Sequence, residues 1–425
     1  MRYLPQTENA RIQMLKSIGA GNVDDLYVDI PKVAMIDGLA DLPNHKSELE
    51  VERALGVMAA KNMTASDAPF FLGAGTYYHH IPAAVDHIIQ RSEFLTAYTP
   101  YQPEIAQGTL QAIFEYQTFI AQLTGQDVAN ASLYDGSTAL AEAALMAMRI
   151  TKRKNIVIGT KLHPHYADVL KSYIGNIDGA EITQGALDDK TACVIVQSPD
   201  FYGCPHKYEK WRKECDEAGA LLVVVTNEVI SLGMLEAPSL ADIVCGEGQS
   251  IGMAMSYGGP HLGFFACKQK YLRQMPGRLC GMTEDADGKR GFVLTLSTRE
   301  QHIRREKATS NICTNQGLCA LAFTIHMSLL GEDGFKNLAR LNHEAACRLA
   351  DALSEVKGVR IINDNFFNEF VIELPKPASI VVEDLATCGI IGGYALDGNH
   401  MLVCATEMTT QDDIEELVNI LSEIL

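Results

Sequence analysis

One short stretch of the chain has the residue types of an anion-binding site. Tyr134-Asp135-Gly136-Ser137-Thr138-Ala139 places a glycine and two hydroxyl side chains where a predicted strand gives way to a predicted helix. The free N–H groups and the dipole of a helix start favour a phosphate or carboxylate there. The alternative is that Ser137 and Thr138 only cap the helix, and spacing alone favours this commoner role.

Tyrosines gather in two other polar stretches, Gly73 to His80 and Tyr98 to Glu104. Their candidate pocket residues are Thr76, Tyr77, Tyr78, Tyr98, Tyr101 and Gln102. Tyrosines this dense are typical of pockets and interfaces, because the ring is apolar and its tip is polar. Ordinary core aromatics are the alternative. The histidines at positions 79, 80, 163 and 165 lack helical metal-ligand spacing, so we predict no metal site.

Charged residues mark two further candidates. Glu228 follows a predicted strand, where an acidic group could hold the ring nitrogen of a heterocyclic cofactor, but a solvated loop glutamate is the favoured interpretation. The stretch from Arg304 to Gln316 begins with mixed charges and ends in a polar turn. Its arginines could position a carboxylate or phosphate. A solvated helix face is the alternative.

The elements that position these residues alternate between strand and helix. Apolar runs predict strands at 127–133, 155–158, 192–197, 220–225, 241–245 and 262–267, and the stretches between several of them predict helices at 137–149, 164–173 and 208–218. Strands that are apolar throughout indicate a mostly parallel sheet covered by helices on both faces. We predict an N-terminal helical arm (1–65) with a capping box at Ser47, a large α/β domain (66–325), and a small C-terminal α+β domain (326–425) whose long helix begins near Phe335.

This layout is typical of the pyridoxal phosphate (PLP)-dependent transferase fold, fold type I. In such enzymes a lysine shortly after the strand at 241–245 forms an imine with the cofactor. Here that position holds Gln249, and no lysine lies between Lys213 and Lys268. An amide cannot form an imine. We predict that Lys268 and Lys270 are surface charges.

Composition narrows the possible partners. The formal net charge of −18 disfavours nucleic acid and anionic membrane surfaces. No apolar run is long enough to span a bilayer, and the N-terminus lacks the apolar core of a secretion signal. The 11 cysteines include no C-x-x-C pair and often lie in apolar runs. We expect reduced, mostly buried thiols in a cytoplasmic protein.

Several of these stretches together resemble one family, the P-protein of the glycine cleavage system, glycine dehydrogenase (decarboxylating). The resemblance is strongest to subunit 1, the alpha subunit of its split form. The stretches that carry it are Gly75-Thr76-Tyr77-Tyr78, residues 98–108, residues 130–139, Ser256-Tyr257-Gly258-Gly259-Pro260 and residues 304–316. They extend from near the N-terminus to residue 316, and the stretch at 98–108 is highly specific.

The resemblance implies a fold type I subunit that pairs with a lysine-bearing beta subunit (subunit 2) in an α2β2 assembly. The beta subunit binds PLP through a lysine at its equivalent of Gln249. The assembled enzyme decarboxylates glycine and transfers the aminomethyl group to the lipoyl arm of H-protein. This chain would anchor no PLP and would complete the partner's pocket with Thr76, Tyr77, Tyr78, Tyr98, Tyr101 and Gln102. Gly136, Ser137 and Thr138 would form a vestigial phosphate site.

Two alternatives remain open. The chain could be a self-sufficient PLP enzyme that uses a displaced lysine such as Lys268 or Lys307. It could also be a non-catalytic binding protein built on a PLP fold.

Overall fold

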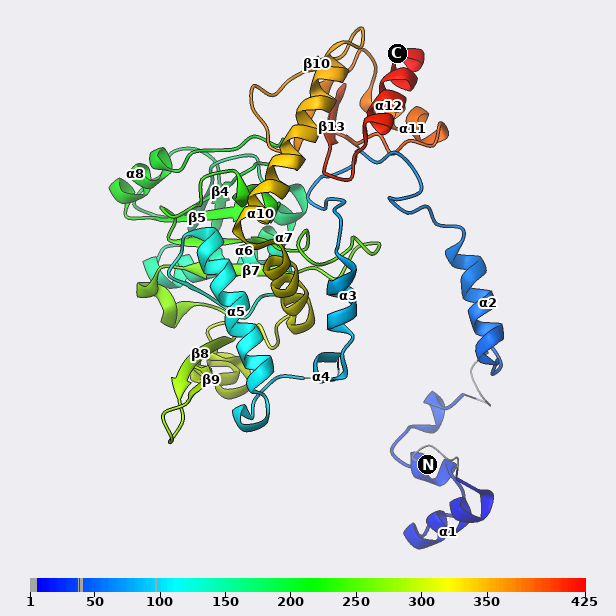
Figure 1. Ribbon diagram of the computed structural model, residues 1–425. Helices are drawn as coiled ribbons and strands as arrows, with labels where there is room; N and C mark the ends of the chain where they lie inside the picture. The colour runs from blue at the N-terminus through cyan, green and yellow to red at the C-terminus, as the bar shows by residue number, and fades with distance from the viewer. Residues whose placement is uncertain (1–5, 37, 39–40, 96–97) are drawn as a thin grey trace. The chain divides into compact units, whose positions relative to one another are not determined.

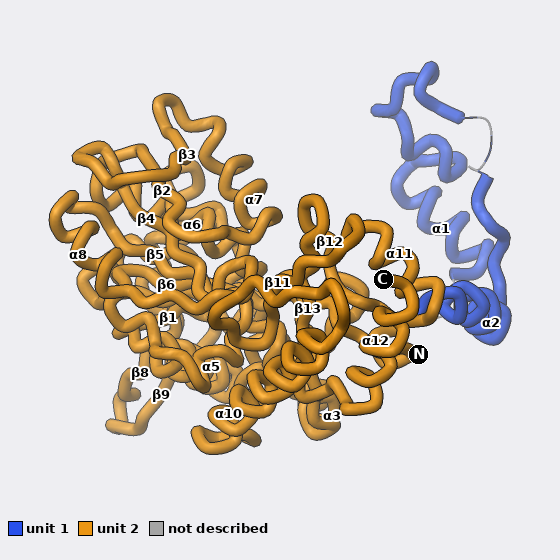
Figure 2. Tube along the Cα trace, turned by 90° about the horizontal axis from the view of Figure 1, so that it is seen from above, with its two compact units in different colours: residues 1–63 blue, residues 64–425 orange. Residues whose placement is uncertain are grey.

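The computed structural model describes residues 6–36, 38, 41–95 and 98–425, which form two compact units. Figure 2 distinguishes unit 1 (residues 1–63) from unit 2 (residues 64–425). Unit 1 contains α1 (Glu8–Ile18) and α2 (Glu48–Ala59), with short 3-10 turns at Asp24–Tyr27 and Lys32–Ala34. The predicted capping box at the start of α2 is confirmed, because Ser47 and Glu50 bond reciprocally. None of the described residues of unit 1 is buried.

Unit 2 is organised around a seven-stranded sheet (Figure 1). In spatial order its strands are β1 (Val128–Ala129), β7 (Gly263–Cys267), β6 (Ile243–Glu247), β5 (Leu221–Thr226), β4 (Thr191–Gln197), β2 (Asn155–Ile158) and β3 (Glu181–Thr183). The strands from β6 to β3 are parallel, whereas β7 runs antiparallel to both of its neighbours. The predicted mostly parallel sheet is confirmed. The first predicted strand is shorter than expected, because Leu133 makes only an isolated bridge to Gly263.

Helices cover both faces of this sheet because its central strands are apolar on both sides. In β5, Leu222 and Val224 pack into one core while Val223 and Val225 pack into the other. The first core is covered by α5 (Gln107–Thr124), α8 (Glu209–Ala218) and the first half of α10 (Gly317–Ser354). The second is covered by α6 (Gly136–Thr151) and α7 (Pro164–Ile174).

Helix α10 connects this sheet to a second, antiparallel sheet. It begins 18 residues before the predicted start at Phe335, and Gly331 interrupts it with φ 61° and ψ −173°. The second sheet has the order β10 (Arg360–Ile361), β11 (Glu369–Glu373), β13 (His400–Cys404) and β12 (Tyr394–Ala395). The second half of α10, α11 (Ala378–Thr387) and α12 (Gln411–Ile424) pack against it.

The remaining elements of unit 2 are short. Helices α3 (Ala83–Ile89) and α4 (Ser92–Leu95) precede α5, and α9 (Gln301–Arg304) precedes α10. The sequence did not predict the hairpin of β8 (Leu279–Glu284) and β9 (Arg290–Thr295). Among the described helices, none combines the length and apolarity needed to cross a bilayer.

Candidate active site and subunit surface

The start of α6 is closed by the chain's own carboxylates. Asp135 caps the helix, and its Oδ1 accepts hydrogen bonds from the backbone nitrogens of Ser137 (2.8 Å) and Thr138 (2.9 Å). The prediction that Ser137 and Thr138 cap the helix is therefore wrong, because the preceding aspartate reaches the free N–H groups first. The third N–H, that of Gly136, donates to Glu247 Oε2 at 3.0 Å.

Glu247 ends β6 and is buried. Its Oε1 accepts from the backbone nitrogens of Gln249 (3.0 Å) and Leu262 (2.7 Å). Burial raises the pKa of Glu247, and nearby His261 opposes the shift. The space above Gly136 is also filled, because a Cβ added there would lie 2.1 Å from the Tyr166 hydroxyl.

Gln249 is held inside the protein by its own amide. The side chain is 2% exposed, and Nε2 donates to the carbonyl of Met253 at 2.7 Å. The next residue, Ser250, donates from Oγ to Glu228 Oε2 at 3.0 Å. The amide at position 249 therefore contributes to a local hydrogen-bonded turn and presents no nucleophile.

Asn227 directly follows β5, close to the end of the neighbouring strand β6. It is buried, and neither polar atom of its amide has a hydrogen-bond partner within the described residues. An amide is neutral, so it cannot stabilise a protonated ring nitrogen as a carboxylate would. The end of β5 thus offers a polar but uncharged group.

Glu228 is buried, so its interpretation as a solvated loop glutamate is wrong. Besides Ser250, it accepts from the nitrogen of Ile230 at 2.9 Å and contacts His79 Nε2 at 3.1 Å. The other ring nitrogen of His79 lies 2.9 Å from Glu407 Oε2. Burial alone would lower the pKa of His79, but Glu228 and Glu407 raise it to about 10. His79 is therefore a buried cation between two carboxylates.

A further buried carboxyl group lies beside this triad. Glu369, on β11, accepts from the backbone nitrogen of Ala74 at 2.5 Å and from the Tyr77 hydroxyl at 3.1 Å. Burial raises the pKa of Glu369 to about 8, against the opposing effect of these two donors. Burial would also raise the pKa of Glu407, but His79 and neighbouring hydrogen bonds lower it to about 2. These contacts fasten the Gly73–His80 stretch to both sheets.

The six predicted pocket residues separate into two groups. Thr76, Tyr77 and Tyr78 lie in the stretch fastened to β11, and the Thr406 hydroxyl donates to the carbonyl of Tyr78 at 2.6 Å. Tyr98, Tyr101 and Gln102 lie in the segment between α4 and α5, where the Tyr101 hydroxyl accepts from Arg278, the residue before β8. Figure 1 shows this segment between the labels α4 and α5. Within the described residues no hydrogen bond joins the two groups.

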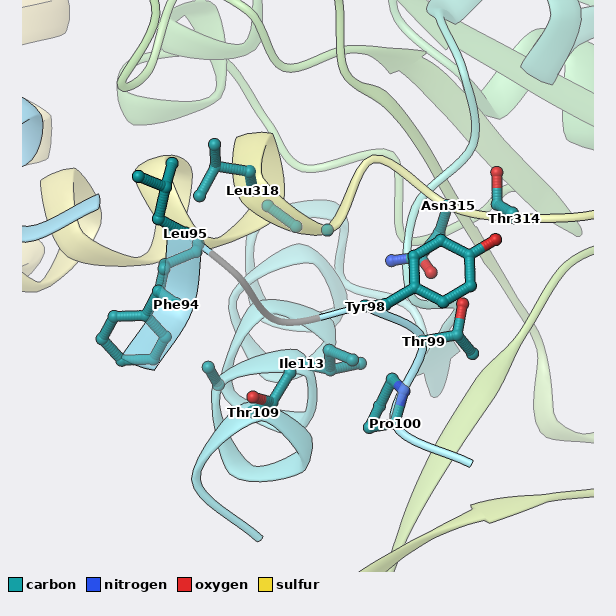
Figure 3. Close-up of a pocket in the computed structure, with 14 residues that line it drawn as sticks. Phe94, Leu95, Tyr98, Thr99, Pro100, Thr109, Ile113, Thr314, Asn315 and Leu318 are labelled. Atoms are coloured by element: carbon teal, nitrogen blue, oxygen red, sulfur yellow. The ribbon is translucent and has the colours of Figure 1, made fainter. Parts of the chain in front are cut away.

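Of the second group, Tyr98 lines a pocket of ≈ 220 Å³, whereas Tyr101 and Gln102 lie outside its lining. Figure 3 shows that its lining comes from α4, the Tyr98–Pro100 stretch, α5, the turn that leads into α10, and the start of α10 itself. Tyr98 is 78% exposed and Tyr101 is 51% exposed. Behind them lies Arg278, a buried arginine that sequence analysis missed, because it belongs to no charged cluster and only the fold brings its partners together.

Comparison with known proteins gives the chain a family. The family model "Glycine cleavage system P-protein" matches residues 1–421. A protein of Maricaulis maris named "Probable glycine dehydrogenase (decarboxylating) subunit 1" is 55% identical over the whole of both chains, and one of Xanthobacter autotrophicus with the same name is 56% identical over the whole of both chains. The chain belongs to the glycine cleavage system P-protein family.

Solved structures agree with this placement. A crystal structure of the P-protein glycine decarboxylase in inhibitor-bound form has a TM-score of 0.94 and 42% identity, with full coverage of both chains. A sphingosine-1-phosphate lyase of Burkholderia pseudomallei shares only the fold, with a TM-score of 0.65 and 15% identity over 92% of this chain and 94% of that one. The fold is therefore that of the fold type I PLP enzymes, as predicted.

This P-protein chain does not fit PLP at the site where its fold would place the cofactor. Gln249 supplies no amine, and Asn227 supplies no charge for the ring nitrogen. The three N–H groups at the start of α6 are already bonded to Asp135 and Glu247. A phosphate would have to displace both carboxylates, and the orphaned Asn227 amide alone does not make a cofactor site.

The displaced-lysine alternative also lacks a suitable geometry. Lys268 directly follows β7, which runs antiparallel to β6, so it lies beside Asp242 at the start of β6. Gln249 follows the other end of β6, a separation of roughly 15 Å along the strand. Lys307 is exposed in a 3-10 turn. Within the described residues, no group of three or more His, Cys, Asp or Glu side chains could hold a metal ion.

Proposed function

We propose that this chain is the subunit of glycine decarboxylase that anchors no cofactor, and that it acts with a lysine-bearing subunit that binds PLP. The observation that carries the proposal is Gln249, a buried amide bonded to a backbone carbonyl where the fold requires an amine. The membership of the P-protein family supports the activity, and relatives named subunit 1 of glycine dehydrogenase (decarboxylating) support the need for a partner. We infer an α2β2 assembly that works on glycine and on lipoylated H-protein.

In the assembled enzyme, PLP on the partner supplies the electron sink that makes loss of CO2 from glycine feasible. The share of this chain is to position groups and exclude water around that site. Tyr98, Tyr101 and Gln102 are exposed and can reach a neighbouring chain, so they are the stronger candidates. Thr76 and Tyr78 are half-buried and Tyr77 is buried, and these residues support the pocket from inside unit 2.

The same assignment makes Gly136, Ser137 and Thr138 a relic of a phosphate site. Their N–H groups remain in place, but resident carboxylates have replaced the ligand. We place the protein in the cytoplasm, because all 11 cysteines are free thiols and seven of them are buried.

Reconstitution tests this function. The chain is purified alone and in co-expression with the lysine-bearing subunit, and each preparation is assayed for glycine-dependent exchange of labelled CO2 with PLP and lipoylated H-protein present. We expect activity only when both subunits are present, in a complex of equal stoichiometry. Activity of this chain alone would contradict the proposal. A complex that is no more active than the partner alone would favour a non-catalytic binding protein instead.

A further inference from the structure

The guanidinium of Arg278 is buried behind the exposed surface formed by Tyr98, Tyr101 and Gln102, here named the tyrosine surface. The side chain is 2% exposed. Its Nη1 donates to Asn315 Oδ1 at 2.9 Å and to Thr99 Oγ1 at 3.4 Å. Its Nη2 donates to the carbonyl of Cys313 at 3.1 Å and to the Tyr101 hydroxyl at 3.4 Å. One side chain therefore joins two stretches of the sequence that are more than 200 residues apart.

The charge of Arg278 is met by a buried carboxylate. Its Nε lies 3.6 Å from Glu300 Oε2, and the same oxygen lies 3.7 Å from His302 Nδ1. The guanidinium lies 5.5 Å from the centroid of the Tyr101 ring, and the His302 ring approaches that ring edge-on with centroids 5.5 Å apart. The Tyr101 ring is thus held by an arginine and by a histidine.

Burying a guanidinium is costly unless paired charges and hydrogen bonds compensate it. Here the paired charge is that of buried Glu300, and the hydrogen bonds come from Thr99, Tyr101, Cys313 and Asn315, which belong to exposed or half-buried stretches. The arginine consequently ties the Thr99–Tyr101 stretch to the Cys313–Asn315 stretch by hydrogen bonds. The rigid, outward-facing tyrosines left there are the residue type enriched where protein chains meet.

We propose that Arg278 is a positioning residue for the shared active site. It fixes the Tyr98–Gln102 stretch against Cys313–Asn315. The lysine-bearing subunit then binds to this tyrosine surface, which is already ordered. This inference rests on the proposed function. It adds that the tyrosine surface is ordered before the subunits assemble. Binding of the partner therefore costs little further conformational entropy in this stretch.

Two substitutions of Arg278 test this role against a matched control. Arg278→Gln removes the charge and most of the fork, and Arg278→Lys keeps the charge but not the planar fork. Arg153→Gln is the control, because Arg153 donates from Nη1 to the carbonyls of Thr191, Ala218 and Gly219. These carbonyls lie near the starts of β4 and β5, and they include none of the tyrosine-surface residues.

Each variant is assembled with a saturating amount of the partner, and kcat, KM for glycine and the absorption spectrum of the partner's PLP are measured. Arg278→Gln should let the tyrosine surface shift, and a displacement of about 1 Å in an active-site residue lowers the rate up to about 100-fold. We therefore expect kcat/KM of Arg278→Gln to fall about 10- to 100-fold. Arg278→Lys should recover part of the loss. Arg153→Gln should lower the midpoint of unfolding and leave kcat/KM within about twofold of wild type.

An active Arg278→Gln complex with unchanged kcat/KM and spectrum would overturn the inference about Arg278 and leave the proposed function intact. An inactive wild-type complex would overturn the proposed function, and the inference with it. If Arg278→Gln does not fold, the combined variant Thr99→Val and Tyr101→Phe removes the two hydroxyl acceptors and leaves the buried charge pair in place. That variant should lower kcat/KM at least about threefold, and an unchanged value would overturn the inference.

Discussion

A lysine placed at position 249 should not turn this chain into a PLP enzyme. Gln249→Lys supplies the missing amine, yet the other two requirements of the cofactor remain unmet. The amide that it replaces donates to the carbonyl of Met253 at 2.7 Å, and the new ammonium would donate to the same acceptor. An ammonium that donates such a hydrogen bond is favoured in its protonated form, and only the neutral amine attacks a carbonyl group.

The phosphate group of PLP opposes cofactor binding more strongly than the protonated lysine does. A phosphate that took over the Gly136 N–H would come within about 4 Å of the Glu247 carboxylate, where two like unit charges repel by about 4 kcal/mol at an effective dielectric of about 20. That repulsion alone lowers affinity by about 1000-fold. Asp135 adds a second carboxylate at the same helix start.

The assay is titration of the purified variant with PLP, followed by borohydride reduction and mass spectrometry of the trapped lysine. Gln249→Met is the matched control, since it has a similar shape and no amine. We expect no difference between the Lys and Met variants at micromolar PLP. Adding Glu247→Gln to the Lys variant frees the Gly136 N–H and should improve PLP binding by at least about tenfold. Stoichiometric attachment to Gln249→Lys alone would refute the reasoning, because it would show an intact phosphate site.

Three further predictions concern the buried groups. Gly136→Ala should destabilise the chain by about 1–3 kcal/mol through its clash with Tyr166, and Gly136→Ala combined with Tyr166→Phe should recover part of that loss in urea unfolding. Glu369, with a pKa raised from 4.5 to about 8, holds a proton in the folded chain that the unfolded chain has lost, so its contribution to stability should fall as pH rises between those values. The test is the difference in unfolding free energy between wild type and Glu369→Gln, measured from about pH 5 to pH 6.5, because this difference cancels the titration of other groups such as His326. The slope of stability against pH should be more positive in Glu369→Gln than in wild type, and equal slopes would contradict the assignment. Replacing either His79 or Glu407 by Ala should cost about 3–5 kcal/mol, and a double-mutant cycle should give a coupling of about 1–3 kcal/mol, whereas additive losses would show that the ion pair is unimportant.

The sequence predicted the large sheet well, because its central strands are buried on both faces and their residues are apolar without interruption. The predicted bounds of β4 and β5 differ from the observed ones by one residue. The β8–β9 hairpin was missed because most residues of its strands are exposed or half-buried and several are charged or polar. The start of α10 was missed because Gly331 interrupts the helical pattern.

The site was predictable only where the signal is local. The absence of a lysine can be read directly from the stretch around Gln249. Asp135 was available as a helix cap, since aspartate before a helix start is a common capping residue. The burial of Glu228 was not predictable, because its partner His79 is 149 residues away in the sequence. Arg278 stands out only when the fold brings Thr99 and Asn315 to the same guanidinium.

Peptide mapping of the cofactor in the assembled enzyme tests the central claim most directly. The complex of this chain with its lysine-bearing partner is loaded with PLP, reduced with borohydride and digested, and the modified peptides are sequenced by mass spectrometry. We predict that the label lies on a lysine of the partner and that peptides of this chain carry none. A PLP-modified peptide from this chain, in the complex or in isolation, would contradict the account.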